Sequence, residues 1–206
     1  MAEMGIKNTE NPLPTPAVTN AVSENTLESE DWKHRPPYHI QGQDEFGPIK
    51  WRGSCKCGKI TYALNRDRPL NAKFCHCRGC QVMHGAPFQW AAIFHKHDIS
   101  FDKGSSGLAF FSASKNSQQY DMPTKVSCSY CHTLIMDEGR TTCLLFPQLI
   151  EREGSQDERR KQLEVFKPTC HIYYEDRMFD VPDELPKWSE MDGKSQRLDD
   201  HGKPIH

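Results

Sequence analysis

The sequence predicts a mainly β or all-β protein with several small sheets. Short runs of β-branched and aromatic residues recur along the middle of the chain, and clusters of Gly, Pro, Asn and Asp separate them. Only residues 154–163 (GSQDERRKQL) combine polar character with helix formers, which indicates a loop or one short exposed helix. We therefore expect many strands and few helices.

Five runs are expected to form strands. In the first, residues 60–64, Ile, Tyr and Leu alternate with Thr and Ala, which is typical of a strand with one buried face. The other four are residues 88–94, 108–112, 141–146 and 171–174. Their aromatic side chains at strand spacing are predicted to be core residues rather than a cage for a substrate; these are Trp90, Phe94, Phe110 and Phe111.

Both ends of the chain are expected to lie outside the folded core. Residues 1–35 contain three alternate prolines followed by Ser, Asn, Thr and Glu, which predicts a disordered leader. Residues 191–206 are equally polar and predict a loose C-terminal tail. The folded domain would then occupy residues 50–190. This division accounts for a hydrophobic fraction of only 36% over the whole chain.

Charge and hydropathy exclude some classes of partner. The 206 residues carry 26 Lys and Arg against 28 Asp and Glu, a formal charge of −2, which argues against nucleic-acid binding. The compact basic run at residues 159–161 follows two acidic residues and predicts a solvated face. No apolar run approaches the ~20 residues that span a bilayer, and no secretory signal is visible. We expect a soluble cytoplasmic protein without a membrane partner.

Nine cysteines indicate a metal-binding protein. An odd number without an export signal argues against disulfides, whereas clustered thiols in a reducing compartment more often bind metal. Cys143 and Cys170 stand alone and are expected to pack in the core as small hydrophobes. The other seven form three clusters: Cys55 and Cys57; Cys75, Cys77 and Cys80; and Cys128 and Cys131.

The spacing favours one closed and one open zinc site. Two cysteines one or two residues apart can bind one ion from a single turn, and Gly58 permits such a turn after the first pair. Two pairs would complete a closed structural site, which leaves three thiols in the middle cluster and an open fourth position, as in catalytic zinc sites. Other arrangements stay open. The middle cluster could pair with either turn, and Cys143, Cys170 or a histidine could supply the fourth ligand.

Several motifs in a fixed order identify a family resemblance that covers roughly residues 50–190. They are residues 53–58 (GSCKCG) followed by Ile60 and Tyr62, residues 75–80 (CHCRGC) with 85–88 (GAPF), residues 128–131 (CSYC), residues 171–174 (HIYY) and residues 185–188 (LPKW). With them the sequence resembles the family of glutathione-dependent formaldehyde-activating enzymes, whose domain also occurs in centromere protein V.

The resemblance implies a β-tent of small antiparallel sheets organised around two zinc ions per chain. It implies that Cys55, Cys57, Cys128 and Cys131 bind a structural zinc, and that Cys75, Cys77 and Cys80 bind the zinc associated with catalysis. The sequence departs from the family at two places. His132 follows the last pair where the family usually has Gly, and Gln81-Val82 stands where it usually has a basic pair. The second departure is close to the catalytic zinc and therefore bears on substrate identity.

The function that this resemblance implies is that of a carbon–sulfur lyase or synthase. Its substrate would be S-hydroxymethylglutathione, formed from glutathione and formaldehyde, or a thiol adduct of another small aldehyde or metabolite. An open zinc suits this chemistry, because it can hold a thiolate and polarise a carbonyl. Two alternatives are a non-catalytic zinc module that binds protein or nucleic acid, and a labile redox or metal-storage site. The sequence assigns no general acid or base.

Residues near the middle cluster have several possible roles. His76 lies between two cysteines and could be a ligand, a proton carrier or a spacer, although alternation points it away from the metal. His84 could lie near the site and take part in catalysis. Residues 85–88 predict a turn into a strand that could also shape a pocket wall. His132 is expected in a surface turn, where a left-handed conformation would strain it.

Overall fold

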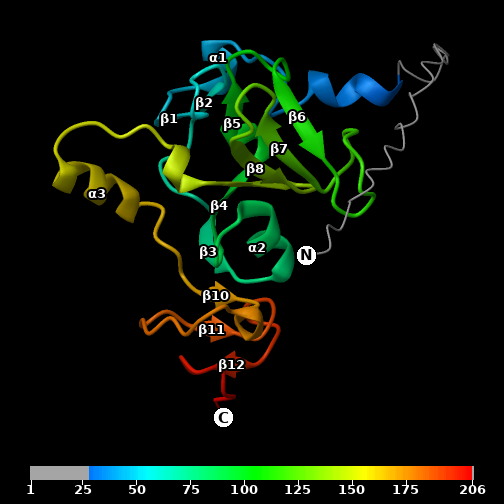
Figure 1. The fold of residues 1–206 in the computed structure, drawn as a ribbon. Helices are drawn as coiled ribbons and strands as arrows, with labels where there is room; N and C mark the ends of the chain where they lie inside the picture. The colour runs from blue at the N-terminus through cyan, green and yellow to red at the C-terminus, as the bar shows by residue number, and fades with distance from the viewer. Residues whose placement is uncertain (1–27, 206) are drawn as a thin grey trace, which may run out of the picture. The chain divides into compact units, whose positions relative to one another are not determined.

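The computed structural model describes residues 28–205, and the described residues from Trp32 onward group as one compact unit. Two sheets dominate this part of the chain, which confirms the prediction of a mainly β protein (Figure 1). The smaller sheet is antiparallel, has the strand order β1-β2-β5, and consists of β1 (Trp51–Ser54), β2 (Thr61–Leu64) and β5 (Ile99–Phe101).

The larger sheet has nine strands in the order β12-β11-β10-β3-β4-β9-β8-β7-β6. The expectation of small antiparallel sheets is wrong here, because the sheet is long and β10 runs parallel to both β3 and β11. Such pairing between distant segments leaves no mark in local alternation. The strands are β3 (Asn71–Cys75), β4 (Gln89–His95), β6 (Leu108–Phe111), β7 (Thr124–Cys128), β8 (Leu134–Glu138), β9 (Thr142–Leu145), β10 (His171–Ile172), β11 (Lys187–Trp188) and β12 (Arg197–Leu198).

Helices are few and short in the described residues. Residues 154–163, predicted as a loop or exposed helix, contain all of α3 but its last residue. The helix begins with a capping box in which Ser155 and Glu158 exchange backbone-to-side-chain hydrogen bonds. No described helix is long and apolar enough to cross a bilayer. The α-helices are α1 (Gln43–Phe46), α2 (Arg78–His84) and α3 (Gln156–Glu164), and the 3-10 helices are η2 (Glu28–His34), η3 (Lys96–Asp98), η4 (Pro147–Leu149) and η5 (Tyr174–Asp176).

The hydrophobic core joins side chains of both sheets. Tyr62 from the small sheet and Phe94 from the large one are fully buried in it. A Cβ at Gly53, opposite Tyr62 in the β1–β2 register, would overlap the tyrosine ring, which explains the glycine. Of the predicted aromatic core residues, Phe94 is fully buried in the core. Trp90 and Phe110 are partly buried and pack against it, whereas Phe111 is half-buried and lies outside it. Cys143 and Cys170 are both buried, as expected for packing residues.

The predicted disordered leader, residues 1–35, extends too far along the chain, because it includes η2. Residues 1–27 of the expected leader lie outside the described residues, but η2 follows them. Within η2 the ring of Trp32 stacks on Tyr120 at 4.1 Å between centroids and meets Tyr38 and Phe110 edge-on. Composition missed this helix because one tryptophan among polar residues anchors it.

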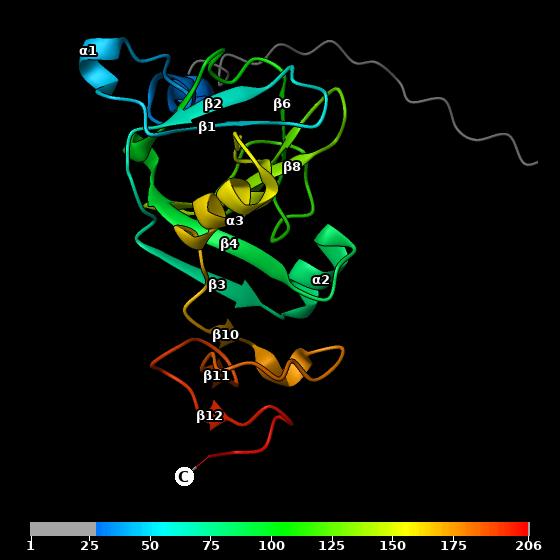
Figure 2. The same ribbon diagram turned by 90° about the vertical axis from the view of Figure 1, so that its left-hand side faces the viewer.

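The C-terminal segment is ordered, contrary to the expected loose tail. β12 pairs with β11, and Leu198 is 2% exposed. The polar side chains that suggested a tail form ion pairs with the rest of the domain: Asp192 pairs with Lys73, and Asp200 pairs with Lys187. Figure 2 shows β10, β11 and β12 following one another beyond β3. The predicted strand at residues 171–174 also ends early, because Tyr173 is left-handed at φ 54° and starts η5.

Candidate metal centres

Four cysteines from two turns meet at one point, and we call them the four-thiol cluster: Cys55, Cys57, Cys128 and Cys131. Their Sγ atoms all lie within 4.8 Å of one another. Cys57 is 3.5 Å from Cys55 and 3.9 Å from Cys128, sulfur to sulfur. Zinc with bonds of about 2.3 Å to four sulfurs in a tetrahedron would separate the sulfurs by about 3.8 Å. The cluster therefore fits a tetrahedral metal ion.

The two turns that carry this cluster have the same backbone conformation at one position. A left-handed residue follows each pair, Gly58 at φ 72° and His132 at φ 59°. Their amides donate to the carbonyls of Cys55 and Cys128, each at 2.9 Å. His132 thus adopts a conformation that glycine takes without strain. The structure gives a physical meaning to the departure from the family pattern at this position.

Hydrogen bonds favour the thiolate form of two members of the four-thiol cluster, Cys55 and Cys131. The amide of Ile60 points at the sulfur of Cys55, 3.3 Å away. The hydroxyl of Thr133 lies 3.2 Å from the sulfur of Cys131 and lowers the pKa of that thiol to about 5. Donors aimed at sulfur stabilise its charged form, which is the form that binds metal.

The other cluster, which we call the three-thiol cluster, contains Cys75, Cys77 and Cys80. Cys75 ends β3, Cys77 caps α2, and Cys80 lies in the first turn of that helix, with its amide 3.4 Å from the sulfur of Cys77. The sulfurs lie within 4.8 Å of one another, and in the described chain no atom of a fourth Cys, His, Asp or Glu joins them. Hydrogen bonds from Cys75 and Cys80 lower the pKa of Cys77.

His76 faces away from the three-thiol cluster, as strand alternation predicts. Its Nε2 lies 2.8 Å from Nδ1 of His171, and its side chain is almost fully buried. Burial lowers the pKa of His76 to about 4, since an imidazolium there would lose its water. The ring joins β3 to β10 and is not placed as a metal ligand.

A buried ion network continues from His171. Nε2 of His171 lies 3.0 Å from the carboxylate of Asp183, which also accepts from Lys187 at 2.7 Å. Lys187 is 2% exposed and bonds as well to Asp200 at 2.8 Å. Local sequence does not predict this network, because its members are spread over residues 171–200 and only the fold brings them together.

A second group of polar side chains lies beside the three-thiol cluster. Gln89 is directly opposite Cys75 in the β3–β4 register, so both side chains lie on the same face of the sheet. His84 lies four residues after Cys80 in α2 and therefore shares its helical face. Views in Figures 1 and 2 place α2 beside the end of β3. The structure thus brings His84 close to the cluster, as the sequence suggested, and adds Gln89, which the sequence did not single out.

Three buried atoms of this polar group have no hydrogen-bond partner in the described structure. They are Nε2 of His84, Oε1 of Gln89 and Oδ1 of Asp137. Burial lowers the pKa of His84, while the negative charge of Asp137 and an interaction with the side chain of Gln89 oppose that effect. A cavity of about 230 Å³ adjoins the group, and it is lined by His84, Ala86, Phe88, Gln89, Trp90, Leu134, Phe146, Gln148 and Leu149. Residues 85–88 therefore form both a turn into β4 and part of a cavity wall.

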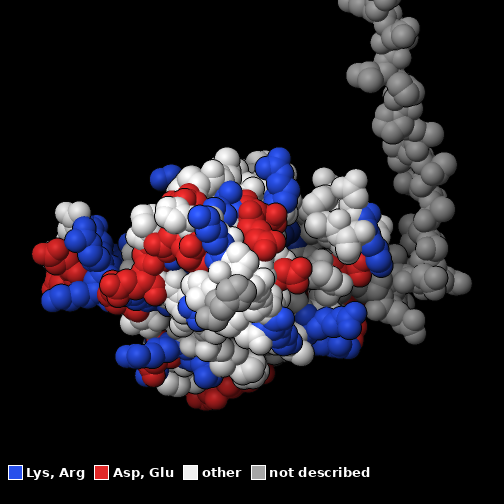
Figure 3. Space-filling model, turned by 90° about the horizontal axis from the view of Figure 1, so that it is seen from below, with Lys and Arg blue, Asp and Glu red and all other residues white. Residues whose placement is uncertain are grey.

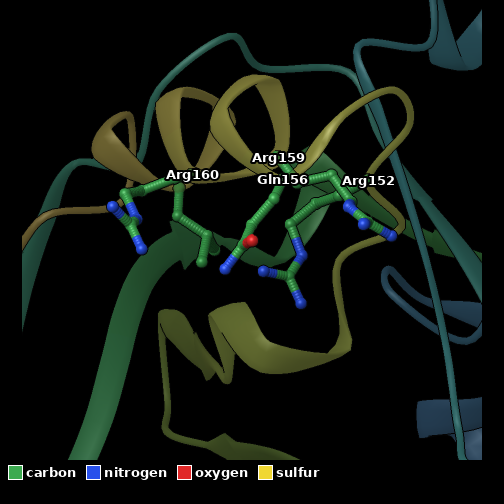
Figure 4. A pocket seen from close by; sticks show the side chains of 5 residues that line it. Arg152, Gln156, Arg159 and Arg160 are labelled. Atoms are coloured by element: carbon green, nitrogen blue, oxygen red, sulfur yellow. The ribbon is translucent and has the colours of Figure 1, made fainter.

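The basic run on α3 forms a separate surface pocket. Its volume is about 400 Å³, and it is lined by Arg152, Gln156, Arg159, Arg160 and Leu163. The labelled side chains project from one side of α3 and its preceding loop (Figure 4). Four acidic residues lie in the same exposed segment, Glu151, Glu153, Asp157 and Glu158. On the face seen in Figure 3, cationic and anionic side chains are also interspersed, as the small net charge predicts.

Comparison with known proteins identifies one family. The model of the glutathione-dependent formaldehyde-activating enzyme family matches residues 50–176, more than half of the chain. No curated protein matches in sequence. Among solved structures, a Rhodobacter sphaeroides protein studied by structural genomics is similar, with 17% identity, a TM-score of 0.39, and coverage of 52% of this chain and 93% of its own. On the strength of the family match, the chain belongs to the glutathione-dependent formaldehyde-activating enzyme family.

Proposed function

We propose that the chain is a zinc-dependent carbon–sulfur lyase or synthase that acts on glutathione, or another thiol, and a small aldehyde. The observation that carries this proposal is the three-thiol cluster, which offers three sulfur ligands and no fourth one in the described chain. A metal held there would keep one position for a substrate. The family's dependence on glutathione supports a thiol as that substrate.

The proposal includes two zinc ions per chain. Thiolate sulfur is a soft ligand that suits zinc better than magnesium or calcium. The four-thiol cluster would hold a closed structural ion, because all four tetrahedral positions are taken by protein. Cys75, Cys77 and Cys80 would hold the second ion with one position free. The sulfur separations in both clusters are compatible with this assignment.

The proposed reaction joins a thiol to an aldehyde or reverses that step. When bound, the zinc would supply positive charge that favours a substrate thiolate and polarises the aldehyde oxygen. In the forward direction the thiol sulfur loses its proton and bonds to the carbonyl carbon, while the carbonyl oxygen takes up a proton. In this proposal Cys75, Cys77 and Cys80 would hold the ion at the reaction site. Lys125 and Asp137 pair with each other at 2.6 Å and so add no net charge beside it.

Metal content and exchange kinetics test the proposal together. The purified protein should contain about two zinc ions per chain, and Cys80→Ala should retain about one. The unaltered protein should accelerate the exchange between glutathione, formaldehyde and their adduct above the spontaneous rate, as followed by NMR exchange spectroscopy. Cys80→Ala should lose that acceleration.

Cys170→Ala is the matched control, since it removes a buried thiol that belongs to neither cluster. It should retain both ions and full acceleration. A protein with two ions and no acceleration would contradict the enzyme proposal and favour a binding module. A second ion that is absent from the purified protein yet taken up reversibly would instead favour metal storage.

A further inference from the structure

The pocket on α3 shares no lining residue with either thiol cluster. Its volume is about 400 Å³, which lies within the range of roughly 300–1,000 Å³ typical of pockets for small molecules. Arg152, in the loop before α3, forms one part of its wall (Figure 4). The rest comes from four residues of the helix at the spacing i, i+3, i+4 and i+7, which places their side chains on one face: Gln156, Arg159, Arg160 and Leu163.

The acidic side chains next to this pocket are directed elsewhere. None of the described residues that line it is acidic. Glu151 and Glu153 line a different cavity, together with Gln162 from another face of α3. The carboxylate of Glu158 accepts a hydrogen bond from the amide of Ser155 at 2.7 Å, which holds it at the start of the helix. The pocket therefore presents positive charge without a carboxylate in its wall.

Charge is sorted by face along α3. The helix has three acidic and three basic residues, so its formal charges sum to zero. Asp157, Lys161 and Glu164 share a face, because they are spaced i, i+4 and i+7, and this face is not the one that lines the pocket. Glu164 also approaches Lys167 at 4.0 Å. Because opposite charges lie on different faces, the balanced total conceals a basic face.

The three guanidinium groups of the pocket have no partner in the described chain. Among residues 28–205, no ion pair and no hydrogen bond joins the side chains of Arg152, Arg159 or Arg160 to another residue. All three are exposed, and α3 has no buried residue, so packing of the core does not explain their placement. Like charges on one face repel each other, and a bound anion would offset that repulsion. Guanidinium groups match the oxygens of carboxylates and phosphates with paired hydrogen bonds.

The number of cations favours phosphate over carboxylate as the anion. A phosphate monoester carries a charge of about −1.5 to −2 at pH 7, whereas a carboxylate carries a single charge. Two phosphate groups therefore balance three arginines within a small volume, which carboxylates could do only with three separate groups. The pocket also has room for the organic part of such a ligand, to which half-buried Leu163 offers an apolar surface and Gln156 an amide.

We propose that the pocket on α3 is a binding site for a ligand with two phosphate groups, held by Arg152, Arg159 and Arg160. This site is independent of the thiol chemistry proposed above, which does not require it. The same phosphates can belong to a soluble bisphosphate or to the headgroup of a lipid, and the arginines recognise the group that both share.

Fructose 1,6-bisphosphate is a suitable soluble probe. Titrated into the zinc-loaded protein at low salt and followed by isothermal calorimetry, it should bind about tenfold or more tightly than inorganic phosphate, which offers one group. Arg159→Gln should weaken this binding about tenfold, the usual effect of removing one charge-assisted hydrogen bond. Lys161→Gln is the matched control, because it removes the same charge from another face of α3, and it should change binding by less than about twofold.

Arg159→Lys separates directed contacts from general attraction between charges. This variant keeps the charge but loses the planar fork, so it should recover only part of the binding that Arg159→Gln loses. Each variant should unfold in urea like the parent, because α3 has no buried residue. Full recovery in Arg159→Lys would remove the paired hydrogen bonds from the proposal.

Vesicles that contain phosphatidylinositol 4,5-bisphosphate test the lipid source of the same chemistry. Co-sedimentation with them that Arg159→Gln weakens, without binding of the soluble probe, would assign the phosphates to a headgroup, whereas binding of the soluble probe alone would assign them to a free ligand. Absence of binding in both arms would overturn the proposal. Equal weakening by Arg159→Gln and Lys161→Gln, or tighter binding of a tetraglutamate peptide than of the bisphosphate, would also overturn it. None of these outcomes depends on turnover at the three-thiol cluster.

Discussion

The two cysteine clusters use the same ligand atom in different surroundings. The four-thiol cluster lies where two strand-ending turns meet, and its neighbours are backbone amides and the hydroxyl of Thr133, whose donors point at sulfur. The three-thiol cluster lies where β3 passes into α2, beside a cavity and beside polar atoms that lack partners. The four-thiol cluster offers a metal ion four ligands from its own chain, whereas the three-thiol cluster offers three.

This difference separates structure from reactivity better than cysteine spacing does. A cluster that supplies all four ligands leaves no position for a substrate. The free energy of metal binding there stabilises the fold by holding two turns together. A cluster with three ligands leaves a metal position at which a substrate can bind, provided that nearby groups recognise that substrate. The neighbours of the sulfurs therefore indicate the role of each cluster, and substitutions in the two clusters should have different consequences.

The largest expected effect comes from breaking the four-thiol cluster. Cys57→Ser should make the protein aggregate, or lower its free energy of unfolding by several kcal/mol out of the roughly 10 kcal/mol that a structural zinc can contribute. Cys80→Ser, the matched change in the three-thiol cluster, should cost much less, since the four-thiol cluster stays whole. Urea unfolding of both zinc-loaded variants measures the difference. Equal losses would contradict the division into structural and reactive clusters.

A smaller loss is expected from the ion network behind the three-thiol cluster. Lys187→Met removes a buried cation and leaves Asp183 and Asp200 facing each other's charge. Breaking such a pair can cost 3–5 kcal/mol, but both carboxylates are about a third or more exposed, so we expect about 2–3 kcal/mol in urea unfolding. Lys194→Met, on an exposed lysine of the same segment, serves as the control. A neutral Lys187→Met would show that the C-terminal strands do not depend on this network.

Much of the fold and of the metal clusters could be predicted from local sequence. The strand within residues 60–64, the helix that begins within 154–163 and the grouping of seven cysteines all follow from features within a few residues of one another. The errors lie where distant segments meet. Leu198 is buried because β12 reaches β11, and the side chains around it look like those of a solvated tail until their ion pairs are known.

The candidate site divides in the same way. The three thiols could be found from the spacing of Cys75, Cys77 and Cys80, and His84 from its place in the same helix. Gln89 could not be found, because its importance depends on its register with Cys75 and on Asp137 from another strand. Hydrogen bonds between strands, rather than residue type, determine which glutamine faces the cavity.

Chelation should distinguish the two clusters without any substitution. The ion of the three-thiol cluster should leave first, since three protein ligands hold it less firmly than four. Glutathione at about 100 times its dissociation constant should slow that loss, because occupied protein is stabilised by about 2.7 kcal/mol. Zinc release into a colorimetric chelator, with oxidised glutathione as the control, measures both effects. Two ions that leave together, unaffected by glutathione, would indicate two closed sites.

The smallest expected effect compares the two turns of the four-thiol cluster with each other. Gly58 and His132 occupy corresponding left-handed positions, but only histidine has a Cβ that makes this conformation costly, by about 1 kcal/mol. His132→Gly should therefore raise the free energy of unfolding by up to about 1 kcal/mol. The greater conformational entropy of glycine in the unfolded chain reduces this gain. His132→Ala removes the exposed imidazole and keeps the strained backbone, so it should change little. Urea unfolding of the two zinc-loaded variants isolates the backbone contribution. A glycine variant less stable than the alanine variant would mean that the family's usual residue at this turn has lost its advantage in this chain.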